Sequence, residues 1–329
     1  MGRRTHGPSG VRVRPVSDGK RATIGVALGG GSARGYAHLG ALACLERNDL
    51  KPDVIVGTSF GAVVGALYAT GESVEALITR ASAMRRRDVI PHVADFGLHH
   101  AALFRGRRLE EYFDRLLEGR RFEDLRGDLV VVTTDVDTGE RVLLREGPLA
   151  PALRASASLP GVFAPVEIAG RRLIDGGIGS PVPLDTVVEL GVDVALGIGA
   201  GMQARDSRSI RLARRALSAE PVRRLHGRAL QRRPRTALGR LGHAIALAAG
   251  TWLQDDSDVR EEQVRAESAG RFEVHTRPPI SWLNFHRAAE AIAAGDAALT
   301  TVVPRLRRAV SAVVHGRARA PVALSVAGD

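Results

Sequence analysis

Two kinds of hydrophobic segment alternate along the chain. Short apolar runs at residues 22–28 and 53–57 have the length and composition of buried strands. Each is followed by a longer stretch, 35–48 or 61–71, in which apolar residues recur at helical spacing. Strands that alternate with helices predict a mostly parallel sheet covered by helices on both faces. We therefore expect a three-layer α/β/α sandwich.

The alternation continues toward the C-terminus with less regular spacing. Residues 128–144 predict two strands joined by a turn at 137–139. The further expected strands are 171–177, 193–201 and 272–278, and the further expected helices are 72–87, 107–118, 148–158, 183–191 and 285–313, the last broken near Gly295.

Charge divides the chain into unequal parts. The net charge is +11, and residues 205–240 alone hold twelve arginines against two acidic residues. We expect a disordered basic tail at 1–21 and the main α/β domain at 22–201. An arginine-rich insert with an apolar helix is expected at 202–256, and a strand and helices that complete the domain at 257–329.

The arginine-rich segment raises the question of a partner. It is followed by about 13 mostly apolar residues, 241–253, which are too short to cross a bilayer but suited to lie on its surface. We expect 205–253 to contact an anionic membrane peripherally, although a solvated loop beside a core helix would give the same pattern. No aromatic residue interleaves the arginines, so we expect no nucleic-acid partner. The oligomeric state is left open.

Targeting and cofactor signals are weak. The basic N-terminal stretch lacks the apolar segment of a signal peptide, which favours a cytoplasmic protein, peripheral at the inner membrane. Cys44 is the single cysteine, so an internal disulfide or a cysteine metal cluster is excluded. We expect no metal and no cofactor.

The segment GTSFG, residues 57–61, stands between a strand and a helix. This is the context of a nucleophile elbow, in which the serine sits on a strained turn and the flanking glycines let the neighbouring backbone approach. Ser59 is therefore the candidate nucleophile, supported by Gly57 and Gly61. An ordinary serine at a helix start is the alternative.

A second glycine-rich turn, ALGGGSARG, follows the first strand. Backbone amides of Gly29, Gly30 and Gly31 at a helix start favour an anion. The anion could be a dinucleotide pyrophosphate, with Asp53 on the ribose, or the oxyanion of an acyl-transfer intermediate. Because the next strand ends in Ser59 rather than in a ribose contact, we favour the oxyanion hole.

Ser59 needs a proton acceptor. The downstream histidines lie in the basic segment, inside a strand or on helical stretches; they are His226, His243, His275, His286 and His315. Asp175, by contrast, ends a strand and precedes Gly176 and Gly177, where an α/β sheet places active-site residues. This placement favours a Ser59–Asp175 dyad.

These motifs together resemble the patatin-like phospholipase family. The glycine loop, the GTSFG elbow, RASASLPGVFAPV at 154–166 and DGG at 175–177 stand in that family's order, and the resemblance covers residues 22–201 and the last helix. It implies Ser59 as nucleophile, Asp175 as base, the glycine loop as oxyanion hole and Arg34 as the anchor of that loop. Phe60 departs from the smaller residue expected after the serine, which affects the shape of the acyl pocket.

The resemblance implies a serine lipid-acyl hydrolase of the phospholipase A or lysophospholipase type, acting on a lipid ester. A lone carboxylate is a weak base in water, so we predict a water-poor site that raises the pKa of Asp175. The alternatives are a non-catalytic membrane-associated regulatory module on the same fold and a nicotinamide-binding enzyme. An intact Ser59, Asp175 and glycine loop favour the hydrolase.

Overall fold

The computed structural model describes residues 21–85, 88, 95–99, 102–160, 162–201, 270–276, 278–281 and 284–316. Its centre is an eight-stranded sheet in the order β10-β9-β1-β2-β5-β8-β7, with β6 paired to β5. The strands are β1 Ile24–Leu28, β2 Val54–Thr58, β5 Asp128–Asp135, β6 Arg141–Leu144, β7 Val166–Ile168, β8 Arg171–Asp175, β9 Val194–Gly199 and β10 Arg271–His275. A separate hairpin joins β3 Phe96–His99 to β4 Ala102–Phe104.

The sheet is parallel at one end and antiparallel at the other. Strands β10, β9, β1, β2 and β5 are parallel neighbours, whereas β6, β8 and β7 pair antiparallel. The mostly parallel sheet predicted from the sequence is confirmed, with this antiparallel end as an addition. Strand β8 runs antiparallel to β5 but overlaps only its last residues, so Asp175, the last residue of β8, pairs with Thr133 near the end of β5.

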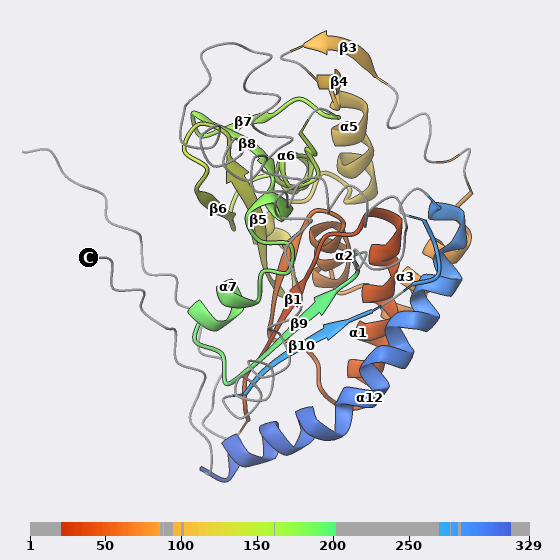
Figure 1. Cartoon of the computed structure of the whole chain (residues 1–329), viewed down its shortest axis with the longest axis vertical. Coiled ribbons are helices and arrows are strands. Elements are labelled where there is room, and N and C mark those ends of the chain that lie inside the picture. The colour runs from red at the N-terminus through yellow and green to blue at the C-terminus, as the bar shows by residue number, and fades with distance from the viewer. Residues whose placement is uncertain are drawn as a thin grey trace, which may run out of the picture.

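Helices cover both faces of the sheet, as Figure 1 shows. The α-helices are α1 Ala37–Arg47, α2 Phe60–Ala69, α3 Val74–Ser82, α5 Arg107–Leu116, α6 Leu149–Ser156, α7 Leu184–Glu189 and α12 Ala288–Val314. Short 3-10 turns are η1 Ser32–Tyr36, η2 Phe122–Asp124, η3 Gly176–Ile178 and η5 Phe285–Arg287. Within the described residues, α7 lies on one face and the other α-helices on the opposite face, which gives the predicted three layers.

Two apolar cores separate these layers. Alternate residues of β2 point to opposite faces, so Ile55 joins the core beneath α1, α2 and α12 whereas Val54 and Val56 join the core beneath α7. On α7, Leu184 and Val187 complete this second core. Strands buried on both faces read as continuous apolar runs, which is why the sequence revealed them.

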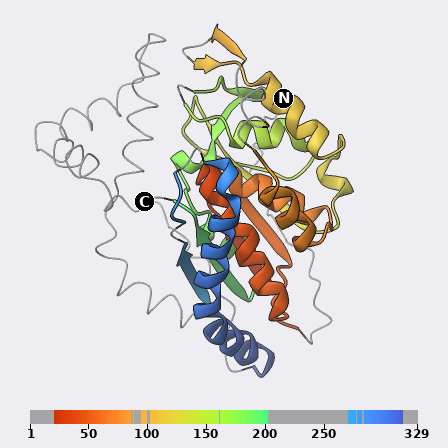
Figure 2. The ribbon, with the colours of Figure 1, turned by 90° about the vertical axis from the view of Figure 1, so that its right-hand side faces the viewer.

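The helix expected to break near Gly295 is continuous, so that prediction was wrong. Helix α12 runs alongside α1 (Figure 2), and glycines on each helix face the partner's backbone. A Cβ added at Gly295 would lie 1.8 Å from the carbonyl oxygen of Ala37, and one at Gly40 would lie 1.9 Å from that of Ile292. These glycines allow a close helix crossing and do not end the helix.

The outcome of the other secondary-structure predictions depends on where they lie in the chain. The expected strands and helices between residues 22 and 201 are found within a few residues of their predicted bounds, whereas β3, β4 and β7 were not predicted. Residues 1–20 and 202–269, which include most of the basic tail and all of the arginine-rich segment, lie outside the described residues. Among the helices that are described, none is long and apolar enough to cross a membrane.

Candidate active site

The ends of β1, β2 and β8 meet at one edge of the sheet. The glycine loop follows β1, Ser59 follows β2, and Asp175 is the last residue of β8. A Cβ added at Gly30 would lie 3.5 Å from the Cβ of Ser59, so the loop and the elbow are in direct contact. The structure thus brings together Ser59, Asp175 and the glycine loop, the three parts of the candidate site predicted from the sequence.

Ser59 occupies a strained turn between β2 and α2. Its backbone φ is 54° and its ψ is −126°, a region that residues with a side chain rarely adopt. The helix begins at the next residue because Ala62 N–H and Val63 N–H both donate to the Ser59 carbonyl. Since the serine is partly exposed, a substrate can reach it.

The flanking glycines allow this turn to pack. A Cβ at Gly61 would lie 2.2 Å from the carbonyl oxygen of Leu28, and a Cβ at Gly57 would lie 2.4 Å from the Cα of Ala62. Helix α2 can therefore approach the end of β1 only with glycine at these positions. This packing supports the positions predicted for Gly57 and Gly61.

The amides of the glycine loop are not equivalent. Gly29 N–H donates to the carbonyl of Ile198 at 2.9 Å, and Gly30 N–H donates to that of Pro181 at 3.0 Å. Within the described residues, the amide of Gly31 has no such acceptor. The expectation that all three amides face an oxyanion is therefore corrected for this conformation, because the first two fasten the loop to its neighbours.

Asp175 is buried beside the nucleophile. Its residue is 7% exposed, and burial raises the pKa of its carboxyl to about 6. Hydrogen bonds from the Gly177 amide, at 2.7 Å, and from the Ser59 hydroxyl stabilise the ionised carboxylate and oppose that shift. The predicted burial and raised pKa of Asp175 are confirmed. The next residue, Gly176, leaves no room for a side chain, because an added Cβ would lie 2.4 Å from the carbonyl oxygen of Val132.

Two buried ionisable side chains, Arg34 and His38, follow the glycine loop along the chain, and the role of Arg34 as an anchor stays a prediction. Arg34 lies in η1 directly after the glycines, and burial lowers the pKa of its guanidinium. His38, on α1, is fully buried, and its Nε2 donates to the carbonyl of Gly29 at 2.8 Å. Burial lowers the pKa of His38 to about 4, so the ring is neutral near pH 7.

The histidines considered as alternative bases are engaged elsewhere or lie outside the described residues. His275 pairs with Glu273 on β10 at 3.3 Å, and His315 Nδ1 donates to the carbonyl of Ser311 at the end of α12. His226 and His243 fall in the range that is not described. His286 lies in η5.

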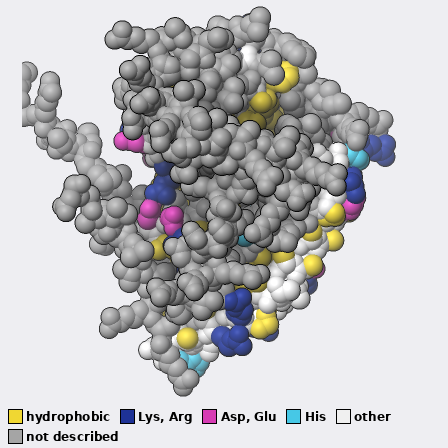
Figure 3. Space-filling model, in the orientation of Figure 1, with side chains coloured by type: hydrophobic (Ala, Val, Ile, Leu, Met, Phe, Trp, Pro, Cys, Tyr) yellow, Lys and Arg dark blue, Asp and Glu magenta, His cyan; other side chains and the backbone are white. Residues whose placement is uncertain are grey.

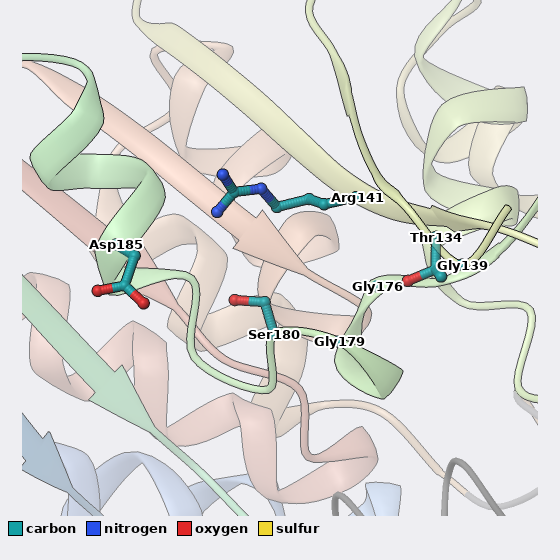
Figure 4. Close-up of a pocket in the computed structure, with 7 residues that line it drawn as sticks. All are labelled: Thr134, Gly139, Arg141, Gly176, Gly179, Ser180 and Asp185. Carbon is teal, nitrogen blue, oxygen red and sulfur yellow. The ribbon is translucent and has the colours of Figure 1, made fainter. Parts of the chain in front are cut away.

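A polar pocket of about 330 Å³ is lined by Gly176, the residue after Asp175, and by Asp185 of α7 (Figure 4). Thr134, Arg141 and Ser180 contribute polar side chains to its wall. Arg141 is held by hydrogen bonds to Thr186 and Glu189. The Thr58 hydroxyl donates to the carbonyl of Ser180 at 3.2 Å, which connects this wall to the residue before Ser59.

Sequence reasoning missed two residues that contact the site. His38 has no motif of its own, and Ser156 stood inside the RASAS segment without a role. The Ser156 hydroxyl accepts a hydrogen bond from the Ser59 amide at 2.8 Å. The signal that could have indicated it is a serine in a helix whose other residues, apart from Arg154, are apolar.

Comparison with known proteins gives the following similarities. Residues 26–188 match the family model described as patatin-like phospholipase. An uncharacterized NTE family protein of Mycobacterium tuberculosis is 32% identical over 191 residues, which cover 58% of this chain and 52% of that protein. Patatin-like phospholipase domain-containing protein 6 of Homo sapiens is 32% identical over 185 residues, or 55% of this chain and 14% of that protein.

The chain thus spans about half the length of the mycobacterial relative and a smaller share of the human one. Among solved structures, VipD from Legionella pneumophila aligns over 87% of this chain and 67% of VipD, with a TM-score of 0.44 and 14% identity.

Proposed function

The chain belongs to the patatin-like phospholipase family through residues 26–188, and on this basis we propose that it is a serine hydrolase that cleaves lipid esters. The proposed type is a phospholipase A or lysophospholipase that uses Ser59 and Asp175 as a catalytic dyad. The observation that carries the proposal is the placement of a strained serine hydroxyl against a buried carboxyl whose pKa is raised to about 6.

The chemistry follows from these positions. Asp175 accepts the proton of the Ser59 hydroxyl as Oγ bonds to the ester carbonyl carbon, which gives a tetrahedral intermediate. When the carbon–oxygen bond to the leaving alcohol breaks, Asp175 returns the proton to that alcohol. Water then attacks the acyl-serine with Asp175 again as base, and the free acid and Ser59 are released.

The proposed oxyanion donor is the amide of Gly31, joined by the next loop amide, Ser32. Both residues are partly exposed and lie at the start of η1, and Ser32 has a φ of 52°. Donors fixed before the reaction lower the barrier by about 3 kcal/mol each. The hydrogen bonds of the Gly29 amide to Ile198 and of the Gly30 amide to Pro181 hold the loop that carries these donors in place.

A non-catalytic module on the same fold is the rival proposal. Such a module would gain nothing from a strained Ser59 or from a buried Asp175, since both lower the stability of the fold. Their coincidence beside the glycine loop therefore favours the hydrolase.

Hydrolysis of an ester panel tests the proposal. The panel holds short- and long-chain esters, a diacyl phospholipid and its lyso form, assayed with wild type, Ser59→Ala and Asp175→Asn. Matched controls are Ser82→Ala and Asp128→Asn, which change an exposed serine on α3 and an exposed aspartate at the start of β5. We expect each dyad variant to lose about 10⁴-fold in kcat and the controls to match wild type.

The same panel separates the alternatives. Activity that survives in Asp175→Asn contradicts the dyad. Absence of hydrolysis in wild type favours the non-catalytic regulatory module instead. Relative rates on the diacyl and lyso substrates assign the type of lipase.

A further inference from the structure

The buried segment Arg154–Ser158 touches both members of the dyad. It contains the last turn of α6 and the two residues that follow it, and Ser156 and Ser158 in it are fully buried. We propose that this segment, which we call the dyad bracket, fixes Ser59 relative to Asp175, with Ser156 as the positioning residue for the nucleophile. The inference rests on the proposed function.

One hydroxyl joins the backbone of the elbow to the backbone of β5. Ser156 Oγ accepts from the Ser59 amide at 2.8 Å and donates to the carbonyl of Val132 at 2.7 Å. The pairing of β2 with β5 ends at Thr58 and Val132, so this hydroxyl links the two strands where the ladder stops. Because the Ser156 hydroxyl donates its proton to the Val132 carbonyl, a lone pair of its oxygen remains to accept from the Ser59 amide.

The same segment holds the base through its backbone. The Asp175 amide donates to the carbonyl of Ser158 at 3.1 Å. Two residues of one short segment therefore set the backbone positions of the nucleophile and the base, which come from strands far apart in sequence. Any shift of the segment relative to β5 changes the geometry of the dyad.

Arg154 anchors the bracket to the rest of the domain. Its residue is 2% exposed, and its guanidinium donates to the carbonyls of Gly106 at 2.8 Å, Arg105 at 2.5 Å and Ala164 at 3.0 Å. It also donates to the Ser158 hydroxyl and lies 5.1 Å from the ring centre of Phe163. These bonds fix a planar group on several sides, so the bracket is rigid.

Removal of the Ser156 hydroxyl would take an acceptor from the Ser59 amide and a donor from the Val132 carbonyl. The Ser59 amide and the Val132 carbonyl would then favour other arrangements, and the strained φ of 54° at Ser59 would lose a support. A displacement of about 1 Å at a reacting group is sufficient to lower the rate about 10²-fold. Ground-state binding of the ester does not involve this hydroxyl, so KM should change little.

Steady-state kinetics combined with hydrogen exchange tests the bracket. Ser156→Ala is compared with Ser156→Cys, which keeps the volume and a weak hydrogen bond, and with Thr23→Ala. Thr23 lies directly before β1, at the opposite end of that strand from the glycine loop. Its hydroxyl also accepts from one backbone amide, that of Asp193 at 3.0 Å, and donates to the Asp193 carboxylate at 2.8 Å, so its loss is a matched structural control. Rates are measured on a soluble short-chain ester, and amide exchange is measured on the peptide that contains Ser59.

We expect Ser156→Ala to lower kcat 10- to 100-fold with KM within 2-fold of wild type, and to speed exchange of the Ser59 amide. Ser156→Cys should fall between Ser156→Ala and wild type, and Thr23→Ala should match wild type in both measurements. If Ser156→Ala does not fold, Ser156→Cys decides.

Wild-type kcat in the folded Ser156 variants, or unchanged exchange at Ser59, overturns the bracket while the hydrolase proposal stands. Absence of hydrolysis in wild type overturns the proposed function, and the catalytic role of the bracket with it.

Discussion

Ser59 and Asp175 are each placed at some expense to stability. A positive φ at a residue with a side chain costs on the order of 1–3 kcal/mol, and a buried carboxylate loses much of its hydration. The surrounding bonds from Ser156, Ser158 and Gly177 hold both residues in these unfavourable states. Such strain is useful where a reactive geometry must exist before the substrate arrives.

The pKa of Asp175 predicts the acid limb of the activity profile. In the proposed dyad Asp175 must be ionised to accept the Ser59 proton, and its pKa in the folded protein is about 6. We expect log kcat/KM to rise with unit slope up to about pH 6 and then to level off. A profile measured from pH 4 to 8 checks this, and an inflection near pH 4 would indicate a base without a raised pKa.

The raised pKa of Asp175 also predicts that folding stability falls as pH rises, whereas activity rises. The pKa of Asp175 rises from 3.8 to about 6 on folding, so the native state binds the proton more tightly, and the stability it contributes at low pH is lost between pH 3.8 and 6. Asn cannot ionise. We expect Asp175→Asn to be more stable than wild type at pH 7.5 by on the order of 2–3 kcal/mol, and similar at pH 3.8.

Urea unfolding at the two pH values measures this difference. His38, whose lowered pKa makes the wild type less stable as pH falls from 6.5 toward 4, is present in both proteins and cancels in the comparison. Equal stability at pH 7.5 would contradict a desolvated carboxylate.

Residues of the site differ in how readily the sequence revealed them. Ser59, Asp175 and the glycines stand in short motifs at strand ends, where local sequence determines the backbone. Ser156 and His38 act through contacts with residues far away in the chain, and a lone serine or histidine carries no local signature. Which of the three glycine amides already has an acceptor depends on the carbonyls of Ile198 and Pro181, and the motif alone does not place those carbonyls.

At the level of elements, the crossing of α1 and α12 explains an error in the sequence reading. Glycine inside a helical pattern suggests a break, because it lowers helix propensity. Here Gly295 faces the backbone of α1. A single sequence does not distinguish the two uses of glycine, since the packing partner lies more than 200 residues away.

Gly295→Ala tests this crossing. The added Cβ would lie 1.8 Å from the carbonyl oxygen of Ala37, so the helices must separate, although alanine favours the helix by about 1 kcal/mol. We expect a net loss of about 2 kcal/mol and a Tm lower by several degrees. Ala297→Ser, at an exposed position of α12, is the control. A higher Tm for Gly295→Ala would show that the helices do not approach closely.

For the whole molecule, α12 forms one long edge, and Figure 3 shows basic and hydrophobic side chains along it. Its last residue, Val314, is 50% exposed.

The large-scale order of strands, helices and site was predictable because buried parallel strands and their crossover helices leave strong periodic signals. The antiparallel end was less predictable, since its strands are short and half-exposed.

The charge of the chain predicts its behaviour toward lipid surfaces. Twelve arginines between 205 and 240 should attract the 329-residue chain to vesicles that contain anionic lipid, at roughly 1 kcal/mol per residue near the surface. We expect co-sedimentation with anionic vesicles, weak binding to zwitterionic ones, and release in 0.5 M salt. A variant with these arginines replaced by glutamine should not sediment. Equal binding to both vesicle types would contradict the electrostatic role.

The most direct test of the account is to find which atom attacks the ester. A fluorophosphonate, which forms a stable bond to an activated serine, is incubated with wild type, Ser59→Ala and Asp175→Asn, and the adduct is located by peptide mass spectrometry. We predict one adduct on Ser59 in wild type, none in Ser59→Ala and much slower labelling in Asp175→Asn. An adduct on another serine, or Ser59 labelled at the wild-type rate without Asp175, would contradict the dyad.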